Sequence, residues 1–215
     1  HSYCPKCGQP LKWYDMVPVF SWIFLGGKCR NCKEKISARY PIVESLNAVL
    51  WTLSAYFIGL NANAFIYDAL FSALIVMTFI DIDTKEIPNG IVVFIIILSI
   101  PLFFTAKDVV WWHRLVGAVV ISVPLYVIAL VTGGIGGGDI KLYFALGLVL
   151  GLYPTLVSAF IAIVSAGLIG GVLLLTKKVR KGYELPLGPF IALGAVVTVF
   201  AGTPIIDGIK NLFGI

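Results

Sequence analysis

The sequence predicts an all-α polytopic membrane protein with about seven transmembrane helices and a small N-terminal cytoplasmic domain that resembles a zinc ribbon. First, 59% of the 215 residues are hydrophobic and only 13% are charged, so a water-facing surface would lack polar cover. Second, long apolar runs recur along the chain. Third, the first forty residues are polar and hold all four cysteines. We therefore predict a domain boundary between residues 1–40 and 41–215.

Two C-x2-C motifs, separated by 21 residues, indicate a structural zinc site in residues 1–40. Two disulfides are the alternative, but they are rare in the reducing cytosol where we expect this domain. A segment of this size has too little core to fold alone, and a bound metal supplies the missing free energy. The predicted Zn²⁺ ligands are Cys4, Cys7, Cys29 and Cys32.

An aromatic stretch lies between the two cysteine motifs and is more apolar than a small ribbon requires. It either contacts lipid head groups, as amphipathic aromatic side chains do, or packs against the ends of the membrane helices. The sequence leaves both alternatives open. The residues concerned are Trp13, Tyr14, Pro18, Val19, Phe20, Trp22, Ile23, Phe24 and Leu25.

Seven apolar runs predict the membrane spans, judged against the roughly 17 to 25 residues that a bilayer needs. The run at 140–153 is short: it continues through Pro154, tilts little or sits inside the bundle, and hydropathy does not decide among these. The predicted spans are 42–60, 64–80, 87–104, 115–132, 140–153, 155–176 and 185–206.

The basic residues predict the orientation. With the first forty residues in the cytoplasm, all but three of the 16 lysines and arginines lie inside, the exceptions being Lys107, Arg114 and Lys210. The net charge of +5 then reflects topology and attraction to anionic lipid, and we predict no nucleic-acid partner. Because the chain starts at His1 without an initiator Met, directly before the cysteines, we expect a processed or truncated product.

Two aspartates stand at the ends of predicted spans. Asp81 closes the apolar run 73–80, and Asp139 directly follows three glycines, 136–138. An aspartate in or beside a membrane costs a few kcal/mol, about 2.5 to 3.5 at a helix centre, so it needs a partner, a wet cavity or a function. Two spans separate the acids, which brings both to the cytoplasmic side. We hypothesise that they meet there and hydrolyse a peptide bond, although a solvated loop at Asp81 and helix capping by Asp139 are simpler alternatives.

Other residues near these acids are candidates for lining the site. Glycines permit positive φ and a close approach of a backbone or substrate strand, although a flexible hairpin would use them too. Lys141 either tunes the acids or extends to the interface, and Glu44 either complements a helix dipole or has a functional role. The predicted site-lining residues are Gly136, Gly137, Gly138, Lys141, Pro186, Gly188, Pro189 and Glu44.

The order of these motifs closely resembles the bacterial type IV prepilin peptidases, also called prepilin leader peptidase/N-methyltransferases, over nearly the whole chain. These are membrane aspartic proteases with a G-x-G-D signature. In this sequence Leu187 replaces the usual Phe, and the further N-terminal span with a G-S-F-x-N stretch is absent. The motifs are the two C-x2-C pairs, Arg39-Tyr40-Pro41 with Glu44, Asp81 with Ile87-Pro88-Asn89, Gly136-Gly137-Gly138-Asp139-Ile140-Lys141 and Pro186-Leu187-Gly188-Pro189.

The resemblance implies an activity, a location and partners. Such enzymes cut basic leader peptides from type IV prepilins and pseudopilins after a glycine, at the cytoplasmic face of the bacterial inner membrane, and many then N-methylate the new terminus with S-adenosylmethionine. Membrane lipids are the other implied partner. The family's catalytic acids match Asp139 and Asp81, which stands seven positions before Pro88; Asp83 is the less favoured match.

Two other function classes fit part of the sequence. A proton-coupled transporter also keeps acids and broken helices in a bundle, but it would hold them near the bilayer midplane and often shows a repeated half. A zinc-ribbon membrane scaffold explains the cysteines and the spans but not the G-G-G-D run.

Overall fold

The computed structural model describes residues 2–106, 109–178 and 185–213, with the side chains of 209, 210, 212 and 213 excepted. Across these residues the chain is helical and forms no strand, only the isolated β-bridges Tyr3–Pro10 and Lys28–Lys35. Some of the basic residues from which we predicted the membrane orientation lie outside the described residues. They are Lys107, Arg180, Lys181 and the side chain of Lys210.

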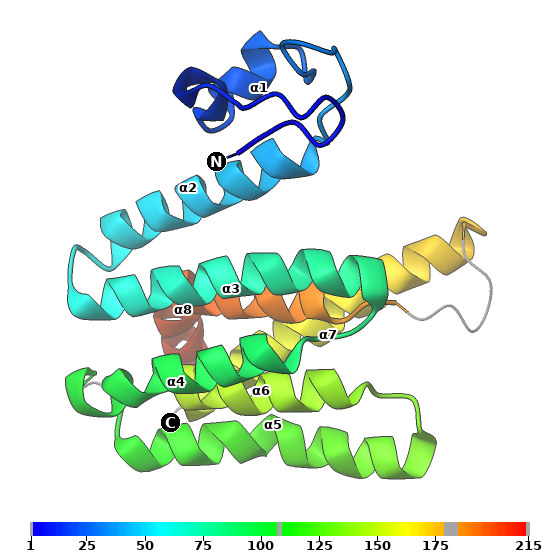
Figure 1. Ribbon diagram of the computed structural model, residues 1–215. Coiled ribbons are helices and arrows are strands. Elements are labelled where there is room, and N and C mark those ends of the chain that lie inside the picture. Colours follow the sequence, from blue (N-terminus) through cyan, green and yellow to red (C-terminus); the bar gives the residue numbers. More distant parts are fainter. Residues whose placement is uncertain (1, 107–108, 179–184, 214–215) are drawn as a thin grey trace. The chain divides into compact units, whose positions relative to one another are not determined.

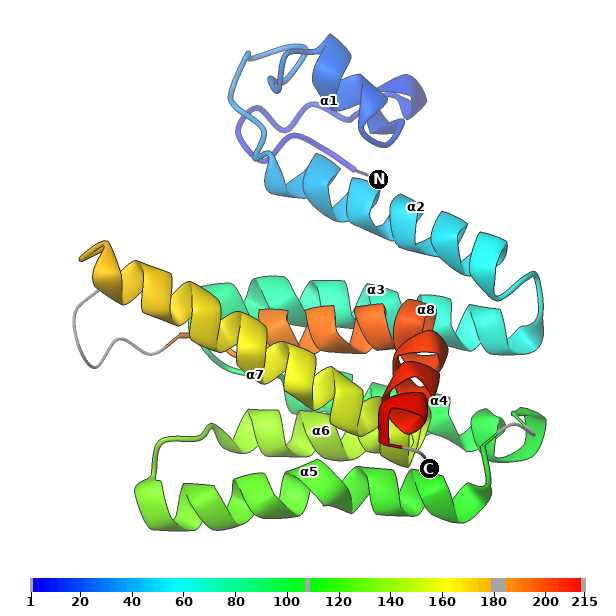
Figure 2. The ribbon, with the colours of Figure 1, turned by 180° about the vertical axis from the view of Figure 1, so that it is seen from behind.

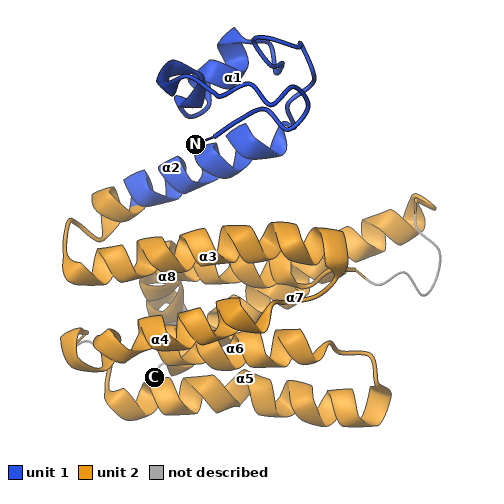
Figure 3. Ribbon diagram, viewed as in Figure 1, with its two compact units in different colours: residues 1–53 blue, residues 54–215 orange. Residues whose placement is uncertain are grey.

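The chain divides into two compact units, residues 1–53 and residues 54–215, each considered by itself (Figure 3). The N-terminal unit contains the 3-10 helix η1 (Trp13–Met16), the short helix α1 (Phe20–Phe24) and most of α2 (Arg39–Phe57). Each cysteine pair begins a tight turn: Cys4 N–H donates to Gln9 O at 3.0 Å, and Cys29 N–H donates to Glu34 O at 2.8 Å. The two turns thus share one geometry, as expected of paired metal-binding knuckles.

The second unit is a bundle of helices whose ranges agree with the predicted apolar runs. In the described part of the chain, α3, α5, α7 and α8 are long and apolar enough to cross a membrane, and α4 is a shorter apolar helix. The chain is therefore a membrane protein, and the count of seven spans stays a prediction. The helices are α3 (Ala62–Thr84), α4 (Asn89–Thr105), α5 (Trp111–Thr132), α6 (Gly137–Leu150), α7 (Leu152–Leu175) and α8 (Gly188–Phe213).

Helix α6 is short and is the central helix of this unit. It contacts α4, α5, α7 and α8, and almost every residue from Leu142 to Leu150 is buried. Gly151, at φ 83°, ends the helix before α7 begins at Leu152. Of the three alternatives for the 140–153 run, burial inside the bundle is the one that the structure shows.

Glycines let α5 and α6 approach each other closely. A Cβ placed on Gly147 would collide with the backbone of Gly117, and a Cβ on Gly117 would lie 2.6 Å from the carbonyl carbon of Gly151. Lipid chains are as apolar as leucine side chains, so close packing of small residues is a main source of helix association in membranes. This glycine contact therefore fixes α6 against α5.

Arg114 in α5 is fully buried, although the sequence suggested only a loop-side basic residue. Its Nη1 donates to Leu148 O at 3.1 Å and also to Val149 O. These carbonyls belong to the last turn of α6, where the helix has no N–H partners of its own. A cation there also complements the helix dipole, so Arg114 caps the C-terminal end of α6.

The helices of this unit alternate in direction, so that the C-terminal ends of α3, α5 and α7 and the N-terminal ends of α4, α6 and α8 lie toward one end. In Figure 1 the C-terminal end of α3 and the N-terminal ends of α4, α6 and α8 lie at the right of the bundle. Figure 2 shows the same arrangement from behind. This end carries both predicted acids.

Candidate active site

Asp81 lies near the C-terminal end of α3 and is 4% exposed. Its Oδ2 accepts a hydrogen bond of 2.8 Å from the backbone N–H of Gly188, the first residue of α8. The first N–H groups of a helix have no partner within the helix and carry the positive end of its dipole. The N-terminus of α8 thus binds a carboxylate that comes from 107 positions earlier in the chain.

Gly188 leaves no room for a side chain. A Cβ at this position would lie 2.7 Å from Asp81 Oδ2 and 2.7 Å from Met77 Sδ, both on α3. The flanking Pro186 and Pro189 are half-buried beside it. Close contact between the α8 N-terminus and Asp81 therefore requires glycine.

Asp139 is the third residue of α6 and is half-buried. The charge of Asp81 acts on it, and the backbone N–H of Gly136 contacts its carboxyl group. The side chain of Asp139 thus reaches back toward the residue before the helix, as in a capping box, and its own N–H donates to Gly136 O at 3.1 Å. Tyr143, one turn further along α6, is buried. The two predicted acids thus belong to the same end of the bundle.

The three glycines before Asp139 do not use left-handed conformations. None of them has a positive φ, and Gly136 has φ −66°, so that interpretation was wrong. The close approach is confirmed at Gly138, where a Cβ would lie 2.9 Å from Ile87 Cβ. Gly137 has no heavy atom within 4 Å of its Cβ position. Gly138 is thus the glycine that lets α6 pack against the segment following Asp81.

Asp83 is exposed in the last turn of α3, whereas Asp81 is buried. Lys85, in the left-handed region at φ 55°, ends the helix, and its backbone N–H donates to Asp81 O at 2.8 Å. Both the backbone and the side chain of Asp81 are therefore held, which favours Asp81 over Asp83 as the member of the site.

Lys141 lies away from the acids. On a helix, residues two positions apart point about 200° apart, so Lys141 and Asp139 project from opposite sides of α6. Lys141 Nζ donates to Asn89 Oδ1 at 3.1 Å, at the N-terminal end of α4. Both residues line a groove of about 540 Å³ between α4, α5 and α6. This geometry gives Lys141 a partner other than the aspartates.

Glu44 belongs to the N-terminal unit and has a partner there. Its Oε2 accepts a hydrogen bond of 2.9 Å from the backbone N–H of Val19, which precedes α1. This bond gives Glu44 a local role in holding α1.

The four cysteines come together as a candidate metal site. Their sulfur atoms all lie within 4.8 Å of one another, and none forms a disulfide. Cys4 Sγ and Cys32 Sγ are 3.8 Å apart. Tetrahedral zinc with Zn–S bonds of about 2.3 Å requires sulfur atoms about 3.8 Å apart, so the donor set fits this ion.

Thiol acidity in this cluster also suits a cation. Backbone N–H groups, that of Cys7 first, lower the pKa of Cys4, and the N–H of Gln9 lowers that of Cys7. For Cys32, the N–H of Glu34 acts in the same direction, but burial and the other three cysteines together raise its pKa to about 11. Crowded thiolates repel each other, and a divalent cation removes that repulsion.

Met77 contacts the Gly188 position but was not among the predicted site residues, because it is an ordinary apolar residue. Ile87 and Asn89 belong to the Ile87-Pro88-Asn89 motif, but the sequence did not predict their contacts with Gly138 and Lys141. Met77 lies four positions before Asp81, on the same side of α3, and this spacing alone could have suggested it.

Two protein families match the sequence. Residues 1–58 match the family described as Bacterial Peptidase A24 N-terminal domain. Residues 69–171 match the Type IV leader peptidase family. The second match includes both Asp81 and Asp139.

Relatives are similar over nearly the whole chain. A Prepilin leader peptidase/N-methyltransferase of Bacillus subtilis (strain 168) is 34% identical over 208 residues, covering 96% of this chain and 84% of the relative. Proteins of the same name are 32% identical in Stutzerimonas stutzeri, over 95% of this chain and 73% of the relative, and 34% identical in Neisseria gonorrhoeae, over 89% and 68%. No solved structure matches the chain.

The glycine contacts predict different effects at neighbouring positions. Gly138→Ala should lower the midpoint of thermal unfolding in detergent, because the new Cβ collides with Ile87 and overpacking costs about 1 to 3 kcal/mol. Gly137→Ala is the matched control: its Cβ enters open space, and the midpoint should stay the same or rise slightly. Equal midpoints for the two variants would contradict the contact at Gly138.

Proposed function

The chain belongs to the type IV leader peptidase family, and on this premise we propose that it removes leader peptides from type IV prepilins and pseudopilins with Asp81 and Asp139 as its catalytic acids. The main support for this proposal is that both acids stand at helix ends on the same side of the bundle, Asp81 in the last turn of α3 and Asp139 in the first turn of α6. A proton-coupled transporter is not favoured, because both acids lie at helix ends.

The reaction is hydrolysis of a peptide bond by an aspartyl pair. Two carboxyl groups that lie close to each other do not both ionise readily, so the pair shares one proton. The ionised carboxylate takes a proton from water as the water oxygen attacks the scissile carbonyl carbon. The protonated carboxyl donates a hydrogen bond to the carbonyl oxygen, and the leaving nitrogen takes up a proton as the C–N bond breaks.

Gly188 acts as a positioning residue in this mechanism. Its N–H donates a hydrogen bond to Oδ2 of Asp81, so we expect Oδ1 to be the oxygen that contacts water or substrate. The direction of the carboxyl group matters because reacting atoms must lie about 3 to 3.5 Å apart in a reactive arrangement. We propose that Pro186 and Pro189, together with Gly136 to Gly138, line the site; Gly188 lies against Asp81 and Gly136 beside Asp139.

The same proposal includes the membrane orientation, the number of spans, the two domains and the cofactors. The active site and the N-terminal domain face the cytoplasm of a bacterial cell, and α2 to α8 provide seven spans surrounded by membrane lipids. Residues 1–40 form a zinc ribbon with structural Zn²⁺ on the four cysteines, and residues 41–215 form the protease domain. The relatives' names include N-methyltransferase; for this chain that activity, and with it S-adenosylmethionine, stays a prediction.

Asp81→Asn and Asp139→Asn should each abolish leader cleavage. Asparagine preserves the shape of the side chain but cannot carry the shared proton, and loss of acid–base catalysis alone lowers rates by about 10²-fold or more. Purified variants incubated with a prepilin, with leader loss followed by mass spectrometry, provide the measurement.

The matched control for both variants is Asp83→Asn, an exposed acid on the same turn of α3 as Asp81. It should keep most of the cleavage activity. Cleavage at the normal rate by either Asp81→Asn or Asp139→Asn would remove that residue from the mechanism.

Gly188→Ala should lower kcat by roughly 10²-fold with little change in KM, because a misplacement of about 1 Å at a catalytic group has an effect of that size. The new Cβ meets two groups, Asp81 and Met77. Adding Met77→Ala removes only the second collision, so the double variant should stay slow. Recovery of kcat in the double variant would mean that packing against Met77, rather than the position of Asp81, limits Gly188→Ala. Gly167→Ala in α7, where the Cβ meets nothing within 4 Å, is the control.

The purified protein should contain about one zinc ion per chain, measured by plasma mass spectrometry. Cys4→Ser should lose that zinc and expose the remaining thiols to labelling, because a four-ligand structural site tolerates no missing ligand. Asp139→Asn should retain the metal. Four unreactive cysteines without zinc, joined as disulfides, would contradict the metal site.

A further inference from the structure

Four large apolar side chains form an exposed surface on the N-terminal unit, here called the aromatic face. Trp13, Phe20, Ile23 and Phe24 are 77%, 63%, 59% and 84% exposed. The last three follow i, i+3, i+4 spacing and share one side of α1, and η1, which carries Trp13, packs beside α1. Single exposed apolar residues are ordinary, but a group of this size on one surface indicates an interaction site.

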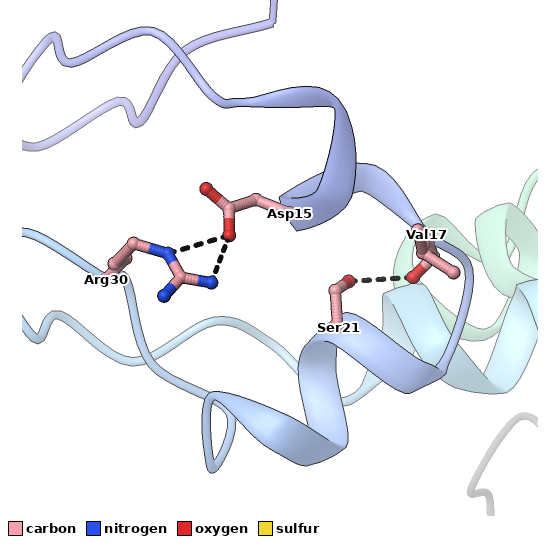
Figure 4. A network of polar contacts seen from close by, with 4 residues as sticks. All are labelled: Asp15, Val17, Ser21 and Arg30. Carbon is pink, nitrogen blue, oxygen red and sulfur yellow. Dashed lines mark hydrogen bonds and ion pairs between the residues drawn. The ribbon is translucent and has the colours of Figure 1, made fainter.

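The aromatic face is rigidly held. Trp22, on the opposite side of α1, donates from Nε1 to Ile36 O at 3.1 Å. Val19, directly before α1, has φ 62°, which is uncommon for a β-branched residue and costs about 1 to 3 kcal/mol. Its N–H is fixed by Glu44, and Ser21 Oγ donates to Val17 O at 2.7 Å (Figure 4). These bonds hold α1 with Phe20, Ile23 and Phe24 directed outward.

Basic side chains accompany the aromatic face. Lys12 and Arg30 lie over the ring of Tyr14, 5.6 and 5.1 Å from its centre, and that ring contacts Trp13 edge to face. Arg30 also pairs with Asp15 at 2.7 Å (Figure 4). Within residues 1–53, lysine and arginine outnumber acids by seven to three. The unit stays positive even after the two negative charges of a zinc tetrathiolate are subtracted.

We propose that the aromatic face docks the N-terminal unit onto the anionic lipid surface of the membrane in which the second unit is embedded. An acidic peptide or a nucleic acid would be bound by the cations and would leave Phe20 and Phe24 in water. Aromatic rings beside lysine and arginine match the head-group region, where rings enter the apolar boundary and cations meet anionic phosphates. The proposal rests on the cytoplasmic orientation of the proposed function, because the cytoplasmic leaflet carries the anionic lipid.

Trp13 provides the probe for a test. The full chain, reconstituted in phosphatidylcholine vesicles with or without phosphatidylglycerol, is compared with its Trp13→Phe variant for fluorescence quenching by brominated lipid. The difference between them reports Trp13 alone. We expect Trp13 to be quenched, more strongly with phosphatidylglycerol, and less at 1 M salt, where the Debye length falls to about 3 Å.

Two variants decide whether the aromatic face is responsible. Phe20→Ser/Phe24→Ser should abolish the quenching of Trp13, whereas Tyr3→Ser, which alters a 64% exposed side chain elsewhere on the unit, should preserve it. Trp13 shielded from brominated lipid and from an aqueous quencher alike would indicate a protein partner and overturn the proposal. Equal quenching in the two variants would overturn it too.

Zinc content and leader cleavage are measured on the same samples. Quenching without cleavage would contradict the proposed function and leave the docking proposal standing. Cleavage without quenching would contradict the docking proposal and leave the proposed function standing.

Discussion

The hydrogen bond from Gly188 to Asp81 is the interaction on which the second unit's functional end depends. A carboxylate at a membrane rim needs a partner, and here the partner is the N-terminus of α8. The bond joins the end of α3 to the start of α8 and leaves no space between them for a side chain at position 188. Because α6 starts at the same end of the unit, Asp139 lies at the end that carries Asp81.

Much of the fold could be predicted because apolar runs in a membrane protein mark helices directly. The ranges of α2 to α7 follow the predicted runs within four residues, and α8 continues seven residues beyond the last predicted run. The same parity of runs placed Asp81 and Asp139 at one end, as the structure shows for the helix termini that carry them. The cysteine cluster was likewise predictable, since C-x2-C spacing constrains each pair locally and only two such pairs exist in the chain.

Other features depended on contacts between helices, which periodicity does not encode. Arg114 looked like a basic residue marking topology, yet it is fully buried and bonds the end of α6. The glycines before Asp139 suggested positive φ, but their backbone is not left-handed, and Gly138 is required by Ile87 from a distant segment. Lys141, two residues from Asp139, bonds Asn89 instead of the acids. In each case the deciding partner comes from another helix or segment.

The proposed mechanism requires the side chains at 81 and 139 to lie within reach of each other in the membrane. Replacing both with cysteine and treating membranes with a short bifunctional thiol reagent tests it directly. We expect a cross-linked 81–139 peptide by mass spectrometry and none when cysteines replace Asp68 and Asp139, because residue 68 lies about 20 Å further along α3. A 68–139 cross-link without an 81–139 cross-link would contradict the shared site.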